Sequence, residues 1–287
     1  MKINPRGGLW MAAGAAVLWA SLAPLGVALS HVPPFLLTGL ALLAGGLVAL
    51  PINGLRARTW QVSWPLLALG VYGLFGFHFL LFISLRLAPP VEANLVNYLW
   101  PLGIVVMAPL FLNEVRWQWR YGIAALIGFS GAAIAILSRG TTGPDGHEQA
   151  WLGYTLALGS AWIWSSYSLL TKRAGHLQTG AIGTFCVVSG LLALVAHWLL
   201  EPAMALDLQD LMLITLLGLG PLGGSFYLWH VALHNADARR VGLIAFATPL
   251  LSTVALLIQN QEPLRASIAV ATGMVVFAAW LGSRNDA

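Results

Sequence analysis

The chain has 287 residues, of which 59% are hydrophobic and only 8% are charged. Roughly a quarter of the residues of an ordinary soluble domain are charged, so this composition excludes a soluble globular fold. The formal net charge is +4, but the 14 Lys and Arg residues stand in short connections, at the termini or at helix ends. Their scatter excludes a nucleic-acid-binding stripe. The single cysteine, Cys186, excludes an intrachain disulfide and a CxxC metal site.

Ten apolar segments bounded by charged residues, Pro or Gly follow one another along the chain. They cover residues 8–29, 34–52, 63–86, 90–112, 119–138, 151–172, 180–200, 208–235, 239–259 and 265–283. Most have near the roughly 20 residues that a helix needs to cross a bilayer. Nothing alternates with a period of two, and lipid excludes open sheet edges, so all ten are predicted to be helices. The first resembles a signal peptide, but its length and the nine segments that follow favour a first membrane helix.

The distribution of basic residues predicts the orientation of these helices. If the N-terminus is cytoplasmic, 11 of the 14 Lys and Arg residues lie on the cytoplasmic side, while Arg86, Arg139 and Arg265 lie outside. Losing or merging one helix would invert every later connection and destroy this asymmetry. The positive-inside rule therefore predicts ten crossings with both termini in the cytoplasm.

Residues 140–150, rich in Gly, Thr and charge, are predicted to be a linker between two halves, residues 1–139 and 151–287. Shifting the sequence by 148 residues, or by 145 for the first helix, superposes similar residues of the two halves. The matched pairs include Pro101 with Pro249, Glu114 with Glu262, Gly70 with Gly218, Gly76 with Gly224, and Trp19 with Trp164. Because five helices per half is an odd number, the two repeats must cross the membrane in opposite directions. Inverted repeats are typical of secondary transporters, whose substrate site lies near the midplane between the halves.

Three segments carry a resemblance to a known family. They are LWPLGIVVMAPLFLNE (99–114), QWRYGIAALIGFSGAAIAI (118–136) and FATPLLSTVALLIQNQEP (246–263), and they resemble the EamA repeat of the drug/metabolite transporter superfamily. Within that superfamily, the Trp-rich helices and residues 74–102 are similar to exporters of aromatic amino acids. The resemblance implies a monomeric ten-helix exporter of aromatic and other neutral amino acids in the bacterial inner membrane, with a cavity lined by helices 1, 3, 4, 6, 8 and 9. Export of another small metabolite or drug is the alternative within the same superfamily.

His78 is a candidate site residue because it lies in the middle of the third helix, after Gly70, Gly73 and Gly76. An imidazole in hydrocarbon is costly unless it faces a cavity or a partner. We expect His78 to face the cavity and to bind substrate or to gate transport by protonation. The alternative is a hydrogen bond to a neighbouring helix.

Trp19 and Trp164 occupy matching repeat positions ten or more residues inside their helices. Most membrane tryptophans lie in belts at the interface, which does not suit this depth. Facing a cavity, the two indoles could stack on an aromatic substrate or contact its ammonium group. Plain packing between helices is the alternative. Tyr227 is a further candidate from the eighth helix.

The fourth helix carries the densest polar pattern of the chain. Asn94, Asn97, Tyr98 and Pro101 recur at helical spacing and share one face, and Trp100 lies beside them. Unpaired amides are costly in lipid, so this face is expected to meet other helices or water. Pro101 removes a backbone hydrogen bond and is expected to kink the helix. Pro249, Gly76 and Gly224 are the other predicted hinge positions.

Glutamates at helix ends are assigned other roles. Glu92 begins the fourth helix, where it either attracts a substrate ammonium group or is a solvated acid favoured by the helix dipole. Glu114 and Glu262 are expected to pair with Arg116 and Arg265.

Several functions are disfavoured by missing motifs. The absence of an acid in the middle of helices 1, 3, 6 and 8 argues against proton antiport through a carboxylate, which leaves downhill export or weak coupling through His78. There is no HExxH motif or intramembrane aspartate pair for an enzyme, and no filter or charge ring for a channel. These absences favour a transporter without metal or cofactor, and the resemblance implies that its partners are amino acids and the lipid bilayer.

Overall fold

The structure is a computed structural model that describes residues 5–53, 60–112, 117–137, 147–174, 179–235, 244, 247–261 and 263–283. Within these ranges every regular element is helical. The elements are α1 (Pro5–Ala20), α2 (Leu22–Ala28), α3 (Pro34–Leu47), α4 (Ala49–Asn53), α5 (Trp64–Val71), η2 (Tyr72–Gly76), α6 (Phe77–Leu87), α7 (Pro90–Asn97), α8 (Trp100–Phe111), α9 (Trp119–Leu137), α10 (His147–Ala174), α11 (Thr179–Leu200), α12 (Leu208–Leu219), η4 (Gly220–Gly224), α13 (Ser225–Asn235), α15 (Ala247–Gln259) and α16 (Ala266–Ser283). The predicted all-α class is confirmed.

Five helical stretches of the described chain are long and apolar enough to cross a membrane. They are Arg6–Ala28, Pro34–Pro51, Trp64–Leu87, Gly180–Leu200 and Leu208–Trp229, and Gly122–Gly131 and Ala266–Ala278 are shorter apolar stretches. Large apolar side chains cover the outside of the bundle, and Trp198 is 80% exposed. Such a surface would be unstable in water and is suited to lipid.

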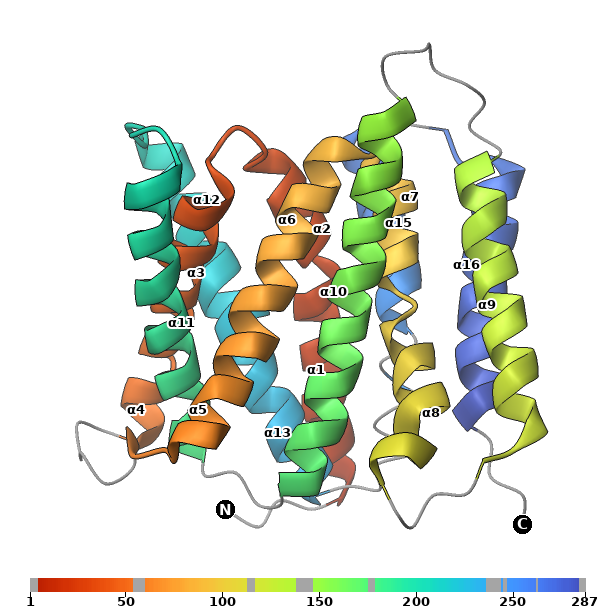
Figure 1. Cartoon of the computed structure of the whole chain (residues 1–287), viewed down its shortest axis with the longest axis horizontal. Coiled ribbons are helices and arrows are strands. Elements are labelled where there is room, and N and C mark those ends of the chain that lie inside the picture. The colour runs from red at the N-terminus through yellow and green to blue at the C-terminus, as the bar shows by residue number, and fades with distance from the viewer. Residues whose placement is uncertain are drawn as a thin grey trace.

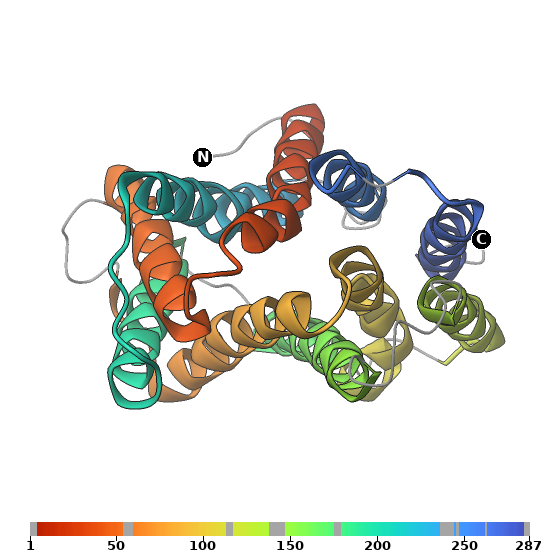
Figure 2. The same ribbon diagram turned by 90° about the horizontal axis from the view of Figure 1, so that it is seen from above.

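Helix packing is symmetric when the two halves are exchanged (Figure 1). The contact of α1 with α13 has its counterpart in the contact of α10 with α6. In the pairs α9–α16 and α3–α11, the two helices are repeat equivalents of each other, so exchanging the halves leaves each pair unchanged. The two pairs lie at opposite ends of the elongated bundle in Figure 2. The repeat seen in the sequence is therefore also present in the packing.

Two predicted helices are interrupted near their middle. The fourth ends as α7 at Asn97, and α8 begins at Trp100, so Pro101 is the second residue of a new helix. A proline cannot follow the preceding turn without a clash between its ring and the carbonyl four residues earlier, here that of Asn97. The first helix is divided in the same way at Ser21, between α1 and α2. Pro249 is the third residue of α15, a position in the first turn, where a missing N–H costs little.

A π-helical turn occurs at the same repeat position in each half. η2 covers Tyr72–Gly76 and η4 covers Gly220–Gly224, and a shift of 148 residues superposes their bounds. A π turn holds one more residue than an α turn and frequently marks a functional site. The two turns are directly followed by α6 and α13, the helices on which His78 and Phe226 lie at the centre of the molecule.

Glycines bring α3 into backbone contact with α12 and η4. A Cβ atom on Gly45 would lie 2.6 Å from the carbonyl oxygen of Leu222, and one on Gly218 would overlap the carbonyl of Ala41. Helices in a membrane associate through such close packing of small residues, because lipid gives no hydrophobic force between them. This contact joins the two halves, since α3 belongs to the first and α12 to the second.

Glu201 connects the start of α3 to the end of α11. Its Oε1 accepts the N–H of Phe35 at 2.9 Å, and its Oε2 accepts that of Leu36 at 3.2 Å. Its Oε2 also lies 2.8 Å from Nδ1 of His197. The carboxylate thus satisfies N–H groups that a helix start leaves without partners. Nearby, Nε2 of His31 lies 2.8 Å from Oδ1 of Asp210.

The backbone contact at Gly45 predicts a strong asymmetry between two glycine substitutions. Gly45→Ala is expected to lower stability by about 1–3 kcal/mol, because the new methyl group meets backbone atoms that cannot rotate away. Gly273→Ala is the matched control, because nothing lies within 4 Å of its added Cβ atom. Apparent melting temperatures in detergent measure both, and equal shifts would contradict the close packing of α3.

Candidate functional site

A small cavity lies where α1, α2, α6, α7, α8, α10, α13 and α15 meet. Aromatic rings and a few polar groups line it, and the structure places together seven of the eight predicted substrate-binding residues. The lining consists of Trp19, Leu22, Phe77, His78, Asn94, Asn97, Tyr98, Trp100, Trp164, Phe226 and Thr248. All of these residues except Leu22, Phe77, Phe226 and Thr248 were candidates from the sequence.

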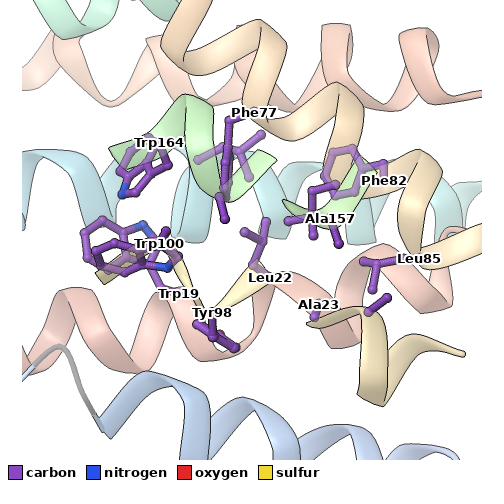
Figure 3. Packing of buried hydrophobic residues seen from close by; sticks show 14 of the residues in the cluster. Trp19, Leu22, Ala23, Phe77, Phe82, Leu85, Tyr98, Trp100, Ala157 and Trp164 are labelled. Atoms are coloured by element: carbon purple, nitrogen blue, oxygen red, sulfur yellow. The ribbon is translucent and has the colours of Figure 1, made fainter. Parts of the chain in front are cut away.

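Three tryptophans form a triangle on one side of the cavity (Figure 3). The ring centroids of Trp19 and Trp164 are 6.1 Å apart, those of Trp19 and Trp100 are 6.2 Å apart, and those of Trp100 and Trp164 are 6.4 Å apart. The interplanar angles lie between 76° and 82°, the edge-to-face geometry that aromatic quadrupoles favour. Each ring comes from a different helix, α1, α8 or α10, so the triangle depends on both halves.

His78 is held in a defined orientation at the edge of this aromatic group. Its Nδ1 lies 2.7 Å from the carbonyl oxygen of Leu74, one turn earlier on the chain. A carbonyl only accepts, so Nδ1 carries the proton and Nε2 is left as the other polar atom of the ring. The imidazole packs edge-on against Phe77 and Phe226, with centroids 4.9 and 6.1 Å away. The alternative predicted from sequence, a bond to a neighbouring helix, is not formed by Nδ1.

Asn94 and Tyr98 form a polar group with Ser252 across the boundary of the two halves. Nδ2 of Asn94 donates to Oγ of Ser252 at 2.9 Å, and the side chain of Tyr98 lies close to both. Ser252 lies on α15 and the other two lie on or beside α7. Buried amides need such partners, so this group orients Asn94 toward the cavity.

Asn97 is positioned by α10. Its Oδ1 lies 2.8 Å from Oγ of Ser160, which also lies 2.7 Å from the carbonyl oxygen of Ala157. One serine proton cannot serve both acceptors fully, which leaves Asn97 with unused hydrogen-bonding capacity beside the cavity. A ligand with donors and acceptors can use this capacity.

Thr248 is a lining residue whose hydroxyl lacks a hydrogen-bond partner in the described part of the chain. The residue is 1% exposed, and its Oγ1 is buried. A buried hydroxyl without a partner costs about 1–3 kcal/mol. A bound polar molecule would remove this cost.

The cavity itself is only about 20 Å³, which is enough for about one water molecule. An amino acid does not fit until the rings of the tryptophan triangle and Phe77 move apart. The structure therefore shows the site closed around its own side chains.

The repeat relation accounts for two of the four lining residues that were not predicted from the sequence, Phe226 and Thr248. A shift of 148 residues pairs His78 with Phe226 and Trp100 with Thr248, and all four line the cavity. Tyr227 lies outside the lining and is instead the repeat partner of Phe79, which stacks on Phe35 at 4.1 Å. Tyr227 points about 100° away from Phe226 around α13, and Phe226 is the one of the two that lines the cavity. Applying the shift to His78 would have selected Phe226.

Other candidates fall elsewhere. Glu92 is 1% exposed, so it is buried rather than a solvated acid, and it does not line the central cavity. Glu114, Arg116, Glu262 and the side chains of Pro101 and Pro249 lie outside the described residues. Among the residues that are described, no group of three or more His, Cys, Asp or Glu is placed to hold a metal ion.

Comparison with known proteins gives the family. The sequence profile of the EamA-like transporter family matches residues 6–137 and 151–284, one match in each half. The chain belongs to the EamA-like transporter family. It is thus a multi-pass membrane transporter built from two repeats.

Two curated relatives align over most of the chain. The aromatic amino acid exporter YddG of Ancylobacter novellus is 34% identical over 91% of this chain and 92% of that protein. The uncharacterized transporter YvbV of Bacillus subtilis is 26% identical over 91% of this chain and 86% of that protein. A solved crystal structure superimposes with a TM-score of 0.75 and 32% identity, over 96% of this chain and 94% of that chain.

The polar groups of the cavity predict opposite effects for two conservative substitutions. Thr248→Val removes a hydroxyl without a partner and is expected to raise the melting temperature of the substrate-free protein by about 2 °C. Ser252→Ala deprives Asn94 of a partner and is expected to destabilise by about 1–3 kcal/mol. Thermal unfolding in detergent without added amino acid measures both. A lower melting temperature for Thr248→Val would show that its hydroxyl has a partner after all.

Proposed function

We propose that the protein exports aromatic and other neutral amino acids from the cytoplasm across the bacterial inner membrane. The observation that carries the proposal is the cavity, in which three tryptophans lie beside two asparagines and an unpartnered threonine hydroxyl. The tryptophan faces suit an aromatic side chain and an ammonium group, and Asn94, Asn97 and Thr248 suit polar backbone groups. The 34% identity to an aromatic amino acid exporter supports this substrate class.

Transport proceeds by alternating access, with substrate-binding roles for Trp19, His78, Asn94, Asn97, Tyr98, Trp100 and Trp164. We add Phe226 and Thr248 to this set because they line the cavity, and we remove Tyr227 because it does not. The halves move about the η2 and η4 turns, which end at Gly76 and Gly224, and about the chain at Pro101 and Pro249. The closed cavity of about 20 Å³ is a conformation between the two open states.

Ten crossings with both termini in the cytoplasm complete the proposal, with repeats at residues 1–139 and 151–287 joined by a linker at 140–150. It is supported by the 11-to-3 distribution of basic residues. It is also supported by Figure 1, where α1 begins and α16 ends at the same end of the bundle. The protein acts as a monomer, and it is a transporter rather than an enzyme. Export of a different small metabolite is the second candidate, favoured by the relative YvbV, whose substrate is not defined by its name.

The assignment of the cavity is tested by transport in proteoliposomes. The protein is expected to give saturable counterflow of labelled phenylalanine and methionine. Trp164→Ala is expected to raise the half-saturating concentration about tenfold, because one aromatic wall of the site is lost. Trp162→Ala is the control, since Trp162 lies on the same helix but is 57% exposed on the outside of the bundle. Absence of saturable uptake of any amino acid would refute the proposed function, whereas equal effects of both variants would refute only the site.

The orientation is tested with fusions to reporter proteins. Green fluorescent protein fused after Ala287 is expected to fluoresce, because it folds only in the cytoplasm. Alkaline phosphatase inserted within residues 140–150 is expected to be active, since it needs the periplasm. The opposite pattern at either position would contradict the ten-crossing topology.

A further inference from the structure

A second and larger cavity opens at the end of the bundle where α6 passes into α7. Its volume is about 560 Å³, and it lies between the end of α2, the α6–α7 turn and the start of α10. Its lining consists of Val27, Ser30, Leu85, Arg86, Leu87, Ala88, Pro89, Pro90 and Ala150. In the proposed topology this is the outer side of the membrane.

Arg86 gives this cavity its charge, and its guanidinium group is poorly satisfied. It donates from Nη2 to the carbonyl oxygen of Val32, and its buried Nε has no acceptor in the described part of the chain. A guanidinium has five N–H donors. Glu201 interacts electrostatically with Arg86, but the hydrogen bonds of its carboxylate within the described chain go to the backbone of α3 and to His197. Arg86 therefore has capacity for a further carboxylate.

One face of α6 joins the two cavities. His78 lines the central cavity, Phe82 lies one turn further, and Leu85 and Arg86 line the second cavity after another turn. The ring of Phe82 lies 6.1 Å from that of His78. A molecule that leaves the centre toward the second cavity passes along this face.

The connection is closed by two apolar side chains against α2. A Cβ atom on Gly26 would lie 3.2 Å from both Phe82 and Leu85, so the two side chains pack tightly on the glycine. Leu22, on the central side of Gly26, lines the first cavity, and Val27 and Ser30, on its other side, line the second. Figure 3 shows Phe82 and Leu85 displaced along the helix from the tryptophan triangle.

We propose that the second cavity is an exit subsite in which Arg86 binds the carboxylate of an amino acid that has passed Phe82 and Leu85. The inference rests on the proposed function, because it takes the substrate to be an amino acid. An arginine binds a carboxylate through paired charge-assisted hydrogen bonds.

Protection of an engineered thiol tests the subsite without a transport assay. Ser30 is exposed in the lining of the cavity, and Cys186 is buried and the single cysteine of the chain. In a Ser30→Cys, Cys186→Ala protein, phenylalanine is expected to slow labelling by a membrane-impermeant thiol reagent. Phenylalaninamide, which lacks the carboxylate, is expected not to. Addition of Arg86→Gln is expected to abolish the protection, and Arg86→Lys is expected to retain part of it.

The controls separate this inference from its rivals. Arg265→Gln removes an exposed basic residue at the start of α16 that does not line the cavity, and it is expected to leave the protection unchanged. Equal protection by phenylalanine and its amide, or loss of protection in Arg265→Gln, would overturn the carboxylate subsite. Slower labelling in phosphatidylglycerol than in phosphatidylcholine vesicles, with no effect of phenylalanine, would identify a site for an anionic lipid headgroup instead and would also overturn it.

Transport by the same variants distinguishes failure of the subsite from failure of the proposed function. Arg86→Gln is expected to raise the half-saturating concentration of external phenylalanine about tenfold, because one charge-assisted contact is lost. The effect on internal phenylalanine is expected to be smaller. Unchanged external affinity in a protein that still transports would refute the subsite alone. A wild-type protein that neither transports nor is protected by any amino acid would refute both.

Discussion

The architecture depends on the close approach of helix backbones at glycine. Lipid provides no hydrophobic force to join one apolar helix to another, so association relies on packing and on polar contacts. At Gly45 and Gly218, α3 of one half meets α12 and η4 of the other without intervening side chains. Glu201 secures one end of the same contact by accepting the first N–H groups of α3. Because this contact holds the halves together at one end of the bundle, the remaining helices can enclose a cavity elsewhere in it.

The cavity is asymmetric although it lies between related halves. Trp19 and Trp164 keep the same chemistry in both repeats, but His78 is matched by Phe226 and Trp100 by Thr248. The proposed substrate, an amino acid, has no symmetry of its own, since a polar end adjoins a side chain. Sequence divergence between the repeats therefore supplies polar groups at some positions and an apolar wall at others. Edge-to-face packing of the three tryptophan rings stabilises this arrangement.

Much of the fold could be predicted because the constraints of a bilayer are visible in sequence. The length of the apolar segments and the need to hydrogen-bond every backbone group within lipid indicate helices. The spacing of Asn94, Asn97 and Tyr98 predicted that they share one helix face. The break of the fourth helix just before Pro101 was predicted only as a kink. The sequence shows that a proline disturbs the helix, but neighbouring helices decide whether the helix bends or breaks there. The contact of Glu201 with α3 joins residues that are 166 positions apart, which no local pattern indicates. Tyr227 was chosen from the aromatic residues of the eighth helix, whereas the direction of a side chain on α13 is set by the register of the preceding π turn.

The matching positions of the two π turns bear on how the protein evolved. A π turn arises when one residue is added to an α-helix and the strain is kept local. η2 and η4 have equal lengths and superposed bounds in the two halves, although few other residues of the repeats still match. Two independent insertions would have had to occur at the same site. A single insertion in an ancestral repeat, before it was duplicated, accounts for both turns, so this distortion is older than the two-repeat protein.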